Sequence, residues 1–234
     1  MAEDKQADED YGHHLFPQRD GRNPKKESVV SKLYFLKFRC QSRMKISMQK
    51  NPMVKILMDS LERAGCTAYM DRHFSCEDCD GSVGGGFDST TSEVVICQNT
   101  VSNQRDMDRM LTHELIHAYD HCRADVDFLR NIKHLACSEI RAANLSGDCT
   151  FANEVSRLHF GLKQHHQACV RDRAIRSILA ARNVSKEAAE KAVDEVFEPC
   201  FKDRRPFGRI PFNRTSANMA YKEHKNPRLY YADL

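Results

Sequence analysis

Apolar residues recur every three or four positions along most of the chain, the spacing of helices that bury one side. The end of one such helix is marked by Gly65, since glycine readily takes the left-handed conformation that follows a helix. Another begins at Ser102, a residue type that caps helix starts. The spacing predicts helices over residues 29–50, 52–64, 127–144 and 186–200. It also predicts one helix that starts at residue 102 and another that starts near residue 151.

Two short stretches show the shorter period of strands. Residues 67–74 alternate between apolar and polar types, and residues 93–97 are a β-branched run. Residues 80–91, between them, are rich in Gly and Ser and are expected to form a loop. The pattern as a whole predicts an α+β fold, in which a small antiparallel sheet precedes a mostly helical bundle.

The chain divides into three parts by composition. Residues 1–28 are polar, charged and largely without pattern, which predicts a disordered tail. Residues 29–203 are long enough for a single domain. Residues 204–234 are basic and aromatic and contain three prolines, so we expect an extended C-terminal tail. That tail either meets an anionic membrane or crosses over the helices, and the sequence leaves both possibilities open.

Composition and charge exclude several classes of protein. Hydrophobic residues make up 41% of the chain and charged residues 29%, as in ordinary globular proteins. The net charge of +3 does not indicate a nucleic-acid-binding protein, so no direct nucleic-acid contact is expected. No apolar run approaches the roughly 20 residues that a membrane-spanning helix needs. The first residues resemble neither a secretory signal nor a transit peptide.

Ten cysteines are many for a chain of 234 residues in a reducing compartment. Their even number favours disulfides, whereas the missing secretory signal favours reduced, buried thiols. Cys76 and Cys79 could form half of a zinc knuckle with Cys66 and Cys97. A second Cys-x-x-Cys pair is absent, so we expect these four cysteines to form disulfides that staple the two predicted strands.

The strongest chemical signal is the sequence His-Glu-Leu-Ile-His at residues 113–117. On a helix, His113 and His117 lie one turn apart on one side, where both imidazoles can bind one metal ion. Glu114 can flank that ion without binding it, and can take a proton from the attacking water. This arrangement predicts a zinc-dependent peptidase whose general base is Glu114.

A catalytic zinc ion usually has three protein ligands. Glu139 is the preferred third ligand, because two antiparallel helices hinged near residue 128 would place it opposite His117. His134 fits a tighter hinge and stays an alternative. Asp120 is another, although its position two turns from His113 suits a residue that orients a ligand histidine.

The donor that stabilises the oxyanion cannot be selected from sequence. Four residues have a suitable side chain, namely Tyr119, His134, Arg141 and His159. The adjacent pair at positions 165 and 166 points two rings in different directions on a helix, so we expect a solvated pair of histidines there.

Three stretches carry a resemblance to a known family. Residues 112–121, which contain the two histidines, resemble the active helix of the mitochondrial inner-membrane-associated metalloproteases that act in ATP synthase assembly. Residues 134–149 and 169–174 resemble that family more specifically. The likeness covers roughly residues 40–215. A vertebrate member of the family has also been catalogued as a Ku-binding protein.

The resemblance implies a zincin-like fold, zinc as cofactor, His113 and His117 as metal ligands, and Glu114 as the catalytic residue. It also implies a location in the mitochondrial intermembrane space, peripherally on the inner membrane. The implied partners are protein substrates and the membrane subunit of the ATP synthase proton channel, which such enzymes process or help to assemble. Disulfides formed during oxidative import would explain the many cysteines without a presequence.

Two other functions stay open at this point. The first is a non-proteolytic assembly chaperone for the proton channel, since the family's assembly role does not need the protease site. The second is a nuclear DNA-repair partner associated with a Ku-type factor, which would have reduced cysteines. In an animal, assembly or turnover would be the expected role, because animal channel subunits are generally made without a cleaved presequence.

Overall fold

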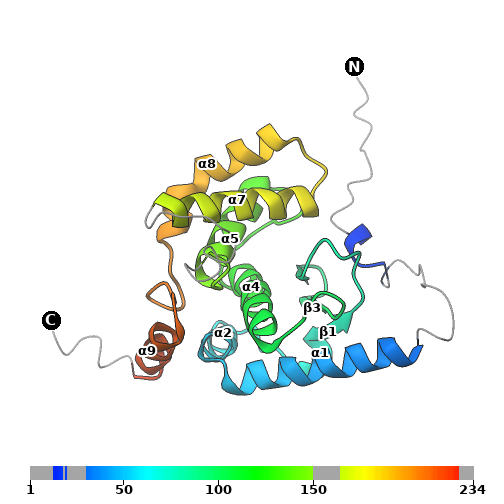
Figure 1. The fold of residues 1–234 in the computed structure, drawn as a ribbon. Coiled ribbons are helices and arrows are strands. Elements are labelled where there is room, and N and C mark those ends of the chain that lie inside the picture. The colour runs from blue at the N-terminus through cyan, green and yellow to red at the C-terminus, as the bar shows by residue number, and fades with distance from the viewer. Residues whose placement is uncertain (1–12, 18, 20–29, 150–163, 227–234) are drawn as a thin grey trace.

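The computed structural model describes residues 13–17, 19, 30–149 and 164–226. Helices dominate it, with one small sheet near its middle (Figure 1). The elements in chain order are η1 (His13–Leu15), α1 (Val30–Lys50), α2 (Pro52–Arg63), α3 (Met70–His73), β1 (Phe74–Glu77), β2 (Gly85–Asp88), β3 (Glu93–Cys97), α4 (Gln104–Arg123), α5 (Ile132–Leu145), α7 (Gln164–Ala181), α8 (Lys186–Lys202) and α9 (Arg214–Lys225).

The sheet has the order β1-β3-β2, so β3 is its central strand. β1 pairs with β3 in parallel, and β2 pairs with β3 antiparallel. The sheet is therefore mixed. The antiparallel pair is formed by β2, where a loop was expected, whereas β1, which overlaps the end of the first predicted strand, pairs with β3 in parallel. One face of the sheet packs on α4, since Val94 and Ile96 of β3 are buried with Leu111 and Leu115 of the helix.

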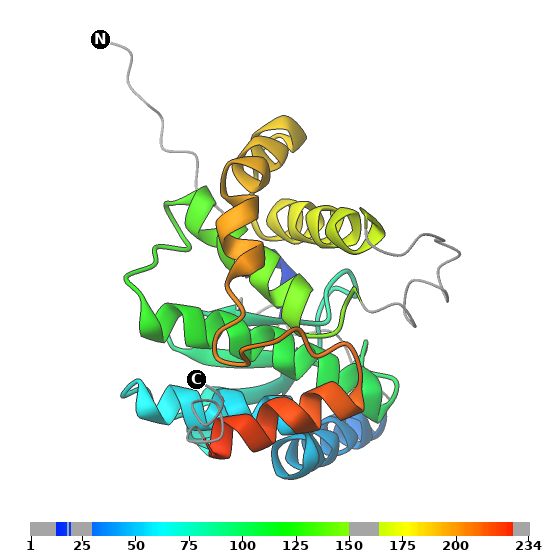
Figure 2. The ribbon, with the colours of Figure 1, turned by 90° about the vertical axis from the view of Figure 1, so that its left-hand side faces the viewer.

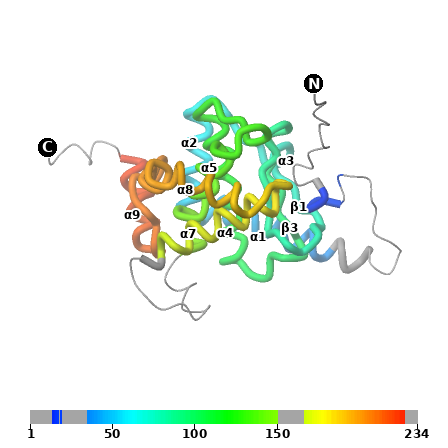
Figure 3. Tube along the Cα trace, turned by 90° about the horizontal axis from the view of Figure 1, so that it is seen from above, coloured from blue at the N-terminus to red at the C-terminus, as the bar shows by residue number. Residues whose placement is uncertain are grey.

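Two hydrophobic cores divide the described chain into two halves. The sheet half contains α1 to α4, the three strands and α9, and its core includes Met44, Leu57 and Leu115. The helical half contains α5, α7 and α8, and its core includes Ile140 and Phe197. Figure 3 looks down onto α7 and α8, which lie over α4 and α5. The halves meet where α4 packs against α5.

All ten cysteines form disulfides, as the even cysteine number favoured. The five pairs are Cys40–Cys76, Cys66–Cys122, Cys79–Cys97, Cys137–Cys200 and Cys149–Cys169. The first three lie within the sheet half and the last two join α5, or the turn after it, to α7 and α8. Of the four cysteines expected to staple the strands, only Cys79 and Cys97 pair with each other. No disulfide joins the two halves.

The α+β class and most predicted helices are confirmed. α1, α2 and α8 match their predicted ranges within about two residues. α4 begins one residue later than expected, because Asn103 rather than Ser102 caps it. α5 begins at Ile132, since the Asp127 carboxylate holds a turn just before it. The helix predicted to start near residue 151 falls on residues 151–163, which lie outside the described residues. α7 was not predicted.

The strand prediction needs two corrections. The segment predicted as a strand over 67–74 contains one helical turn, α3, because the Tyr69 N–H donates to His73 Nδ1. The predicted loop over 80–91 contains β2. A Cβ at Gly85 would lie 2.7 Å from the Val95 carbonyl oxygen, so only glycine lets this strand lie so close to β3. The glycines that indicated a loop therefore form a strand.

The predicted tails are also partly folded. Residues 13–17 and 19 lie against the sheet, where Leu15 is buried and Arg19 pairs with Glu77 and Asp88. The prediction of an extended C-terminal tail is wrong for residues 214–225, which form α9. This helix starts with a capping box between Asn213 and Ser216. Figure 2 shows α9 lying along α2, so this stretch crosses over the helices as one sequence-based alternative proposed.

Candidate active site

The two histidines of the motif lie on the side of α4 that faces away from the sheet-half core. Met107, Leu111 and Leu115 point into that core, so His113 and His117 face the helical half. Their ring centres are 4.9 Å apart and their planes cross at 72°. The helical spacing therefore brings both imidazoles to one place, as the sequence predicted.

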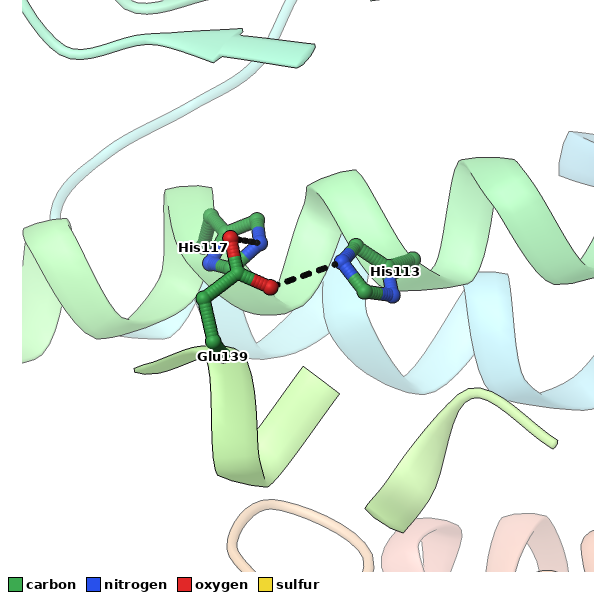
Figure 4. A group of neighbouring side chains, drawn as sticks. All are labelled: His113, His117 and Glu139. Carbon is green, nitrogen blue, oxygen red and sulfur yellow. Dashed lines mark ion pairs between the residues drawn. The ribbon is translucent and has the colours of Figure 1, made fainter. Parts of the chain in front are cut away.

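α5 supplies a carboxylate to the same place. Glu139 Oε2 lies 3.4 Å from His113 Nε2, and Glu139 Oε1 lies 3.5 Å from His117 Nε2 (Figure 4). One ligand atom from each of the three residues fits within 4.8 Å of the others. Among the described residues this is the one group whose donors could hold a metal ion.

The polar atoms of this cluster fit a metal ion. Both histidines have their Nδ1 atoms occupied, by Asp148 and by Ser138, so each turns its Nε2 towards Glu139. Glu139 Oε2 is buried and, within the described part of the chain, has no hydrogen-bond partner. A buried carboxylate oxygen without a partner is costly, and a cation between it and the two Nε2 atoms would satisfy all three groups.

The ionisation of His117 and Glu139 also suits a metal. Burial lowers the pKa of His117, which favours the neutral imidazole that binds metals. Burial opposes ionisation of Glu139, but His117 and His113 outweigh it and lower the pKa of the carboxyl. His113 differs: against the effect of burial, Asp148 and Glu139 raise its pKa well above the ordinary value, so metal binding would release a proton there.

A hydrogen-bonded chain behind His117 fixes its ring. The ring Nδ1 lies 2.7 Å from Ser138 Oγ, which donates to Asp120 at 3.0 Å. Arg141, whose side chain is 1% exposed, donates to both oxygens of Asp120 at 3.0 and 2.9 Å. The sequence suggested that Asp120 orients one of the two histidines. In the structure that histidine is His117, and Ser138 lies between it and Asp120.

Asp148 holds the other histidine and carries a charge cluster. Its Oδ2 lies 3.0 Å from His113 Nδ1 and 3.3 Å from an Arg173 nitrogen, and its Oδ1 lies 3.2 Å from Arg109. Burial opposes its ionisation, yet His113 and the two arginines hold the pKa of Asp148 far below its ordinary value. Asp148 is thus a charged acceptor that fixes the orientation of His113.

Glu114 lies beside the cluster, under the strand β2. A Cβ on Gly85 would come within 3.3 Å of Glu114 Oε1, so the strand backbone passes directly over the carboxylate. Burial raises the pKa of Glu114 to about 8. The positive charge of a bound metal would favour the ionised form, because an opposite charge nearby lowers a carboxyl pKa.

The cluster opens into a cleft of about 820 Å³. β2 borders one side of it and α7 the other, and Phe128 and Leu135 add apolar walls. β3 is the central strand of the sheet, so both of its edges are paired. The sheet edge beside the cleft belongs to β2.

Residues 38–208, well over half of the chain, match the family model described as the peptidase M76 family. The chain belongs to this family. It is 58% identical to a protein of Xenopus laevis named mitochondrial inner membrane protease ATP23 homolog, over the full length of both chains. The human protein of that name is 56% identical over 94% of this chain and 89% of its own length.

A fungal relative, the mitochondrial inner membrane protease atp23 of Aspergillus niger, is 39% identical over 74% of this chain and 73% of its own length. No solved structure matches the chain. As an M76 peptidase the chain is a metallopeptidase, so the family implies a metal cofactor, and the cluster of His113, His117 and Glu139 fits one.

Several candidate residues from the sequence analysis lie outside the cluster and the cleft. His134 is not in the cluster, since its Nδ1 accepts the Asp127 N–H. Of the oxyanion candidates, Tyr119 packs with the sheet-half core and Arg141 is engaged behind His117, so neither lines the cleft. His159 lies outside the described residues. His166 is hydrogen-bonded to Asn144 and to the Cys149 carbonyl, so it is not a solvated ring.

Sequence reasoning missed three polar residues of the M76 site. Ser138 and Asp148 are hydrogen-bonded to His117 and His113, and Arg173 lines the cleft. Ser138 directly precedes Glu139. The two antiparallel helices that led to the prediction of Glu139 could therefore also have indicated Ser138. No sequence spacing relates Asp148 or Arg173 to α4, because their approach depends on how α7 packs.

Proposed function

We propose that this M76 chain is a zinc-dependent endopeptidase in which His113, His117 and Glu139 bind the metal. The observation that carries the proposal is the meeting, inside a cleft, of two Nε2 atoms and a Glu139 oxygen that has no hydrogen bond among the described residues. Two imidazoles and one carboxylate, with a position left open to the cleft, are a common ligand set of catalytic zinc.

When bound, a zinc ion would polarise the scissile carbonyl and lower the pKa of water. Glu114 takes a proton from the attacking water and passes it to the leaving amine. Its burial under β2 supports this role, because a carboxyl with a pKa near neutrality can both accept and donate a proton. Asp148 and Ser138 hold the two imidazoles in the ring orientation that the reaction needs.

Arg173 is the donor best placed to stabilise the oxyanion. It lines the cleft, and its terminal nitrogen lies 3.3 Å from the Asp148 oxygen that also contacts His113. Its Nε is buried and, among the described residues, donates to no acceptor. A substrate carbonyl oxygen that becomes negative during the reaction would supply the missing acceptor.

The substrate is expected to bind as an extended strand along β2. This strand pairs with β3 on one side only, so the backbone groups of its other side face the cleft. Gly85 of β2 keeps a side chain out of the space beside Glu114. Backbone pairing of this kind is compatible with substrates of varied sequence.

We place the enzyme in the mitochondrial intermembrane space, on the inner membrane. The names of the relatives support the membrane, and the five disulfides support an oxidising compartment. Among the described residues, no helix is long and apolar enough to cross a bilayer. The proposed substrates and partners are proteins of this membrane, including the membrane subunit of ATP synthase.

The proposal is tested by Glu114→Gln, which keeps the size of the side chain and removes the base. Cleavage of quenched fluorescent peptides should fall roughly a thousandfold, the middle of the range for loss of a general base. Zinc content and the unfolding midpoint should stay close to those of the wild type. The matched control is Glu93→Gln on the other face of the sheet, which should leave cleavage unchanged.

Retained cleavage in Glu114→Gln would remove the proposed mechanism. The same variant also separates the protease from an assembly chaperone. In cells that depend on this protein, an effect of Glu114→Gln on ATP synthase assembly would assign that role to proteolysis, and normal assembly would assign it to binding.

A further inference from the structure

The outer side of α1 exposes large apolar side chains in a row. Phe38 is 63% exposed, Phe35 57% and Ile46 37%. Cys40 and Met44, on the opposite side of the helix, are buried in the sheet-half core. The helix is thus held firmly on one side, while two phenylalanines one turn apart face outwards on the other.

The same helix is strongly basic. It contains no acidic residue and six basic ones, namely Lys32, Lys37, Arg39, Arg43, Lys45 and Lys50. Arg43 is engaged inwards, by the carbonyl groups of Val101 and Ser102. Arg39 lies over the ring of Phe35, at 5.4 Å from its centre.

The remaining described cations of α1 face solvent without an ion pair. Lys45 and Lys50 are exposed, and no carboxylate of the described chain pairs with them. Lys37 is also exposed, but it borders a hollow beside Phe74 and Glu77 of β1 and so does not belong to the outer side. The net charge of the whole chain is only +3, whereas α1 alone has six basic and no acidic side chains. A convex helix side that combines exposed aromatic rings with free lysines is complementary to an anionic lipid surface.

The position of α1 in the fold agrees with a surface contact. In Figure 1 the helix runs along the lower edge of the molecule, and no other element lies below it. β1 packs against α1 and is joined to it by the Cys40–Cys76 disulfide. β3 alone separates β1 from β2, the strand that borders the cleft. With the outer side of α1 on the lipid, α1 and the three-stranded sheet would lie between the lipid and the cleft.

We propose that the outer side of α1 docks on the surface of an anionic bilayer, with Phe35 and Phe38 entering the headgroup region. Arg39, Lys45 and Lys50 contact lipid phosphates around them. The proposal rests on the inner-membrane location given under the proposed function, and it names the surface responsible. It places the basic C-terminal segment, which contains the exposed Phe212, away from the contact.

The chain contains no tryptophan, so a single introduced one reports on its own surroundings. Phe38→Trp is the test variant, and Phe212→Trp, at a residue 53% exposed near α9, is the matched control. Each is mixed with vesicles of phosphatidylcholine alone or with added phosphatidylglycerol. With anionic vesicles, emission of the Phe38→Trp protein should shift to shorter wavelength and resist an aqueous quencher, whereas the control should not change.

A second variant tests the charges. Lys45→Gln combined with Lys50→Gln should weaken binding to anionic vesicles roughly 25-fold, since each lysine near such a surface contributes about fivefold. Both α1 variants should cleave a soluble peptide as fast as the wild type. Glu114→Gln should bind vesicles normally and cleave nothing, so failure of the docking proposal is distinguishable from failure of the peptidase proposal.

Three outcomes would overturn the docking surface. The first is an absence of vesicle binding, which would leave the row of phenylalanines to a protein partner. The second is a shift in the Phe212→Trp protein but not in the Phe38→Trp protein, which would assign binding to the C-terminal segment. The third is equal binding to neutral and anionic vesicles with unchanged affinity in the lysine variant.

Discussion

The two halves of the molecule are held together in different ways. The sheet half has three disulfides and a core shared by helices and strands. The helical half has two disulfides and a core formed mainly by helices, with Phe128 from the turn before α5 and Phe87 of β2 packed against it. Each half is therefore held together by disulfides and by apolar packing. Between the halves no disulfide exists. Ala142 and Leu145 of α5 pack into the sheet-half core, and beside them the contact between α4 and α5 contains buried charges.

This difference explains where the chemistry lies. His113 and His117 belong to the sheet half, whereas Glu139, Asp148 and Arg173 belong to the helical half or the turn after α5. The site is therefore complete only when the halves are docked. Each half positions its own residues of the site. The two halves are joined by charged groups whose ionisation depends on pH and on a bound metal.

The largest effect on the junction is expected from Arg141→Leu. This side chain donates to Asp120 and to the carbonyl oxygens of Asp203 and Arg205, at 2.5 and 2.6 Å for the two carbonyls. Its loss leaves Asp120 buried with less compensation. The free energy of unfolding of the metal-free protein should fall by about 3–5 kcal/mol, as for other broken buried pairs. Urea unfolding with the disulfides intact measures it.

The matched control is an ion pair inside one half. Lys133 and Glu195 pair at 2.6 Å between α5 and α8, but their side chains are 56% and 36% exposed. Lys133→Ala should cost less than about 1 kcal/mol, because solvent screens such pairs. Equal losses in the two variants would mean that the junction is no more sensitive than the surface.

Arg173→Gln tests whether the helical half contributes to the reaction as well as to metal binding. The value of kcat should fall roughly 100-fold, the lower range for loss of an oxyanion donor, while KM and zinc content change little. Arg176→Gln is the control, since Arg176 also lines the cleft but pairs with the exposed Asp172. Zinc loss in proportion to activity would show that Arg173 acts only by supporting Asp148.

The smallest effect concerns pH. Burial alone would raise the pKa of Asp203, but Arg205, Arg141 and Arg123 outweigh it and hold that pKa well below its ordinary value. Because the folded pKa lies below the unfolded value of about 3.9, the ionised carboxylate stabilises the fold above that pH. The stabilisation is lost as pH falls through the folded pKa.

The advantage in unfolding free energy of the metal-free wild type over Asp203→Asn should thus be constant between about pH 7 and pH 5 and shrink towards pH 3. Chemical denaturation at each pH measures this difference, in which groups common to both proteins cancel. An advantage that grows as pH falls would contradict the assigned contacts.

Sequence periodicity predicted the helices well because each buries one continuous apolar side. It missed β2, where glycines indicated a loop, and could not show that the sheet is mixed. α9 was missed because the prolines before it favoured an extended chain, although Asn213 and Ser216 form a recognisable capping pair. Local contacts thus decided the outcome where periodicity was weak.

The candidate site divides in the same way. His113, Glu114 and His117 lie on one helix, so their spacing was sufficient to place them. Glu139 was reachable through the hinge between two antiparallel helices. Asp148 and Arg173 come from a turn and from α7, and only the docking of the halves brings them to His113.

The central claim is that Glu139 completes a zinc site between the two halves. Zinc measured by mass spectrometry, in protein purified without chelators, tests it most directly, together with a zinc titration of the stripped protein. The wild type and Glu114→Gln should each hold about one zinc ion per chain, as a three-ligand catalytic site does. Glu139→Gln should bind zinc more than about 100-fold more weakly, beyond the effect of losing an outer partner. Wild-type zinc affinity in Glu139→Gln would contradict the account.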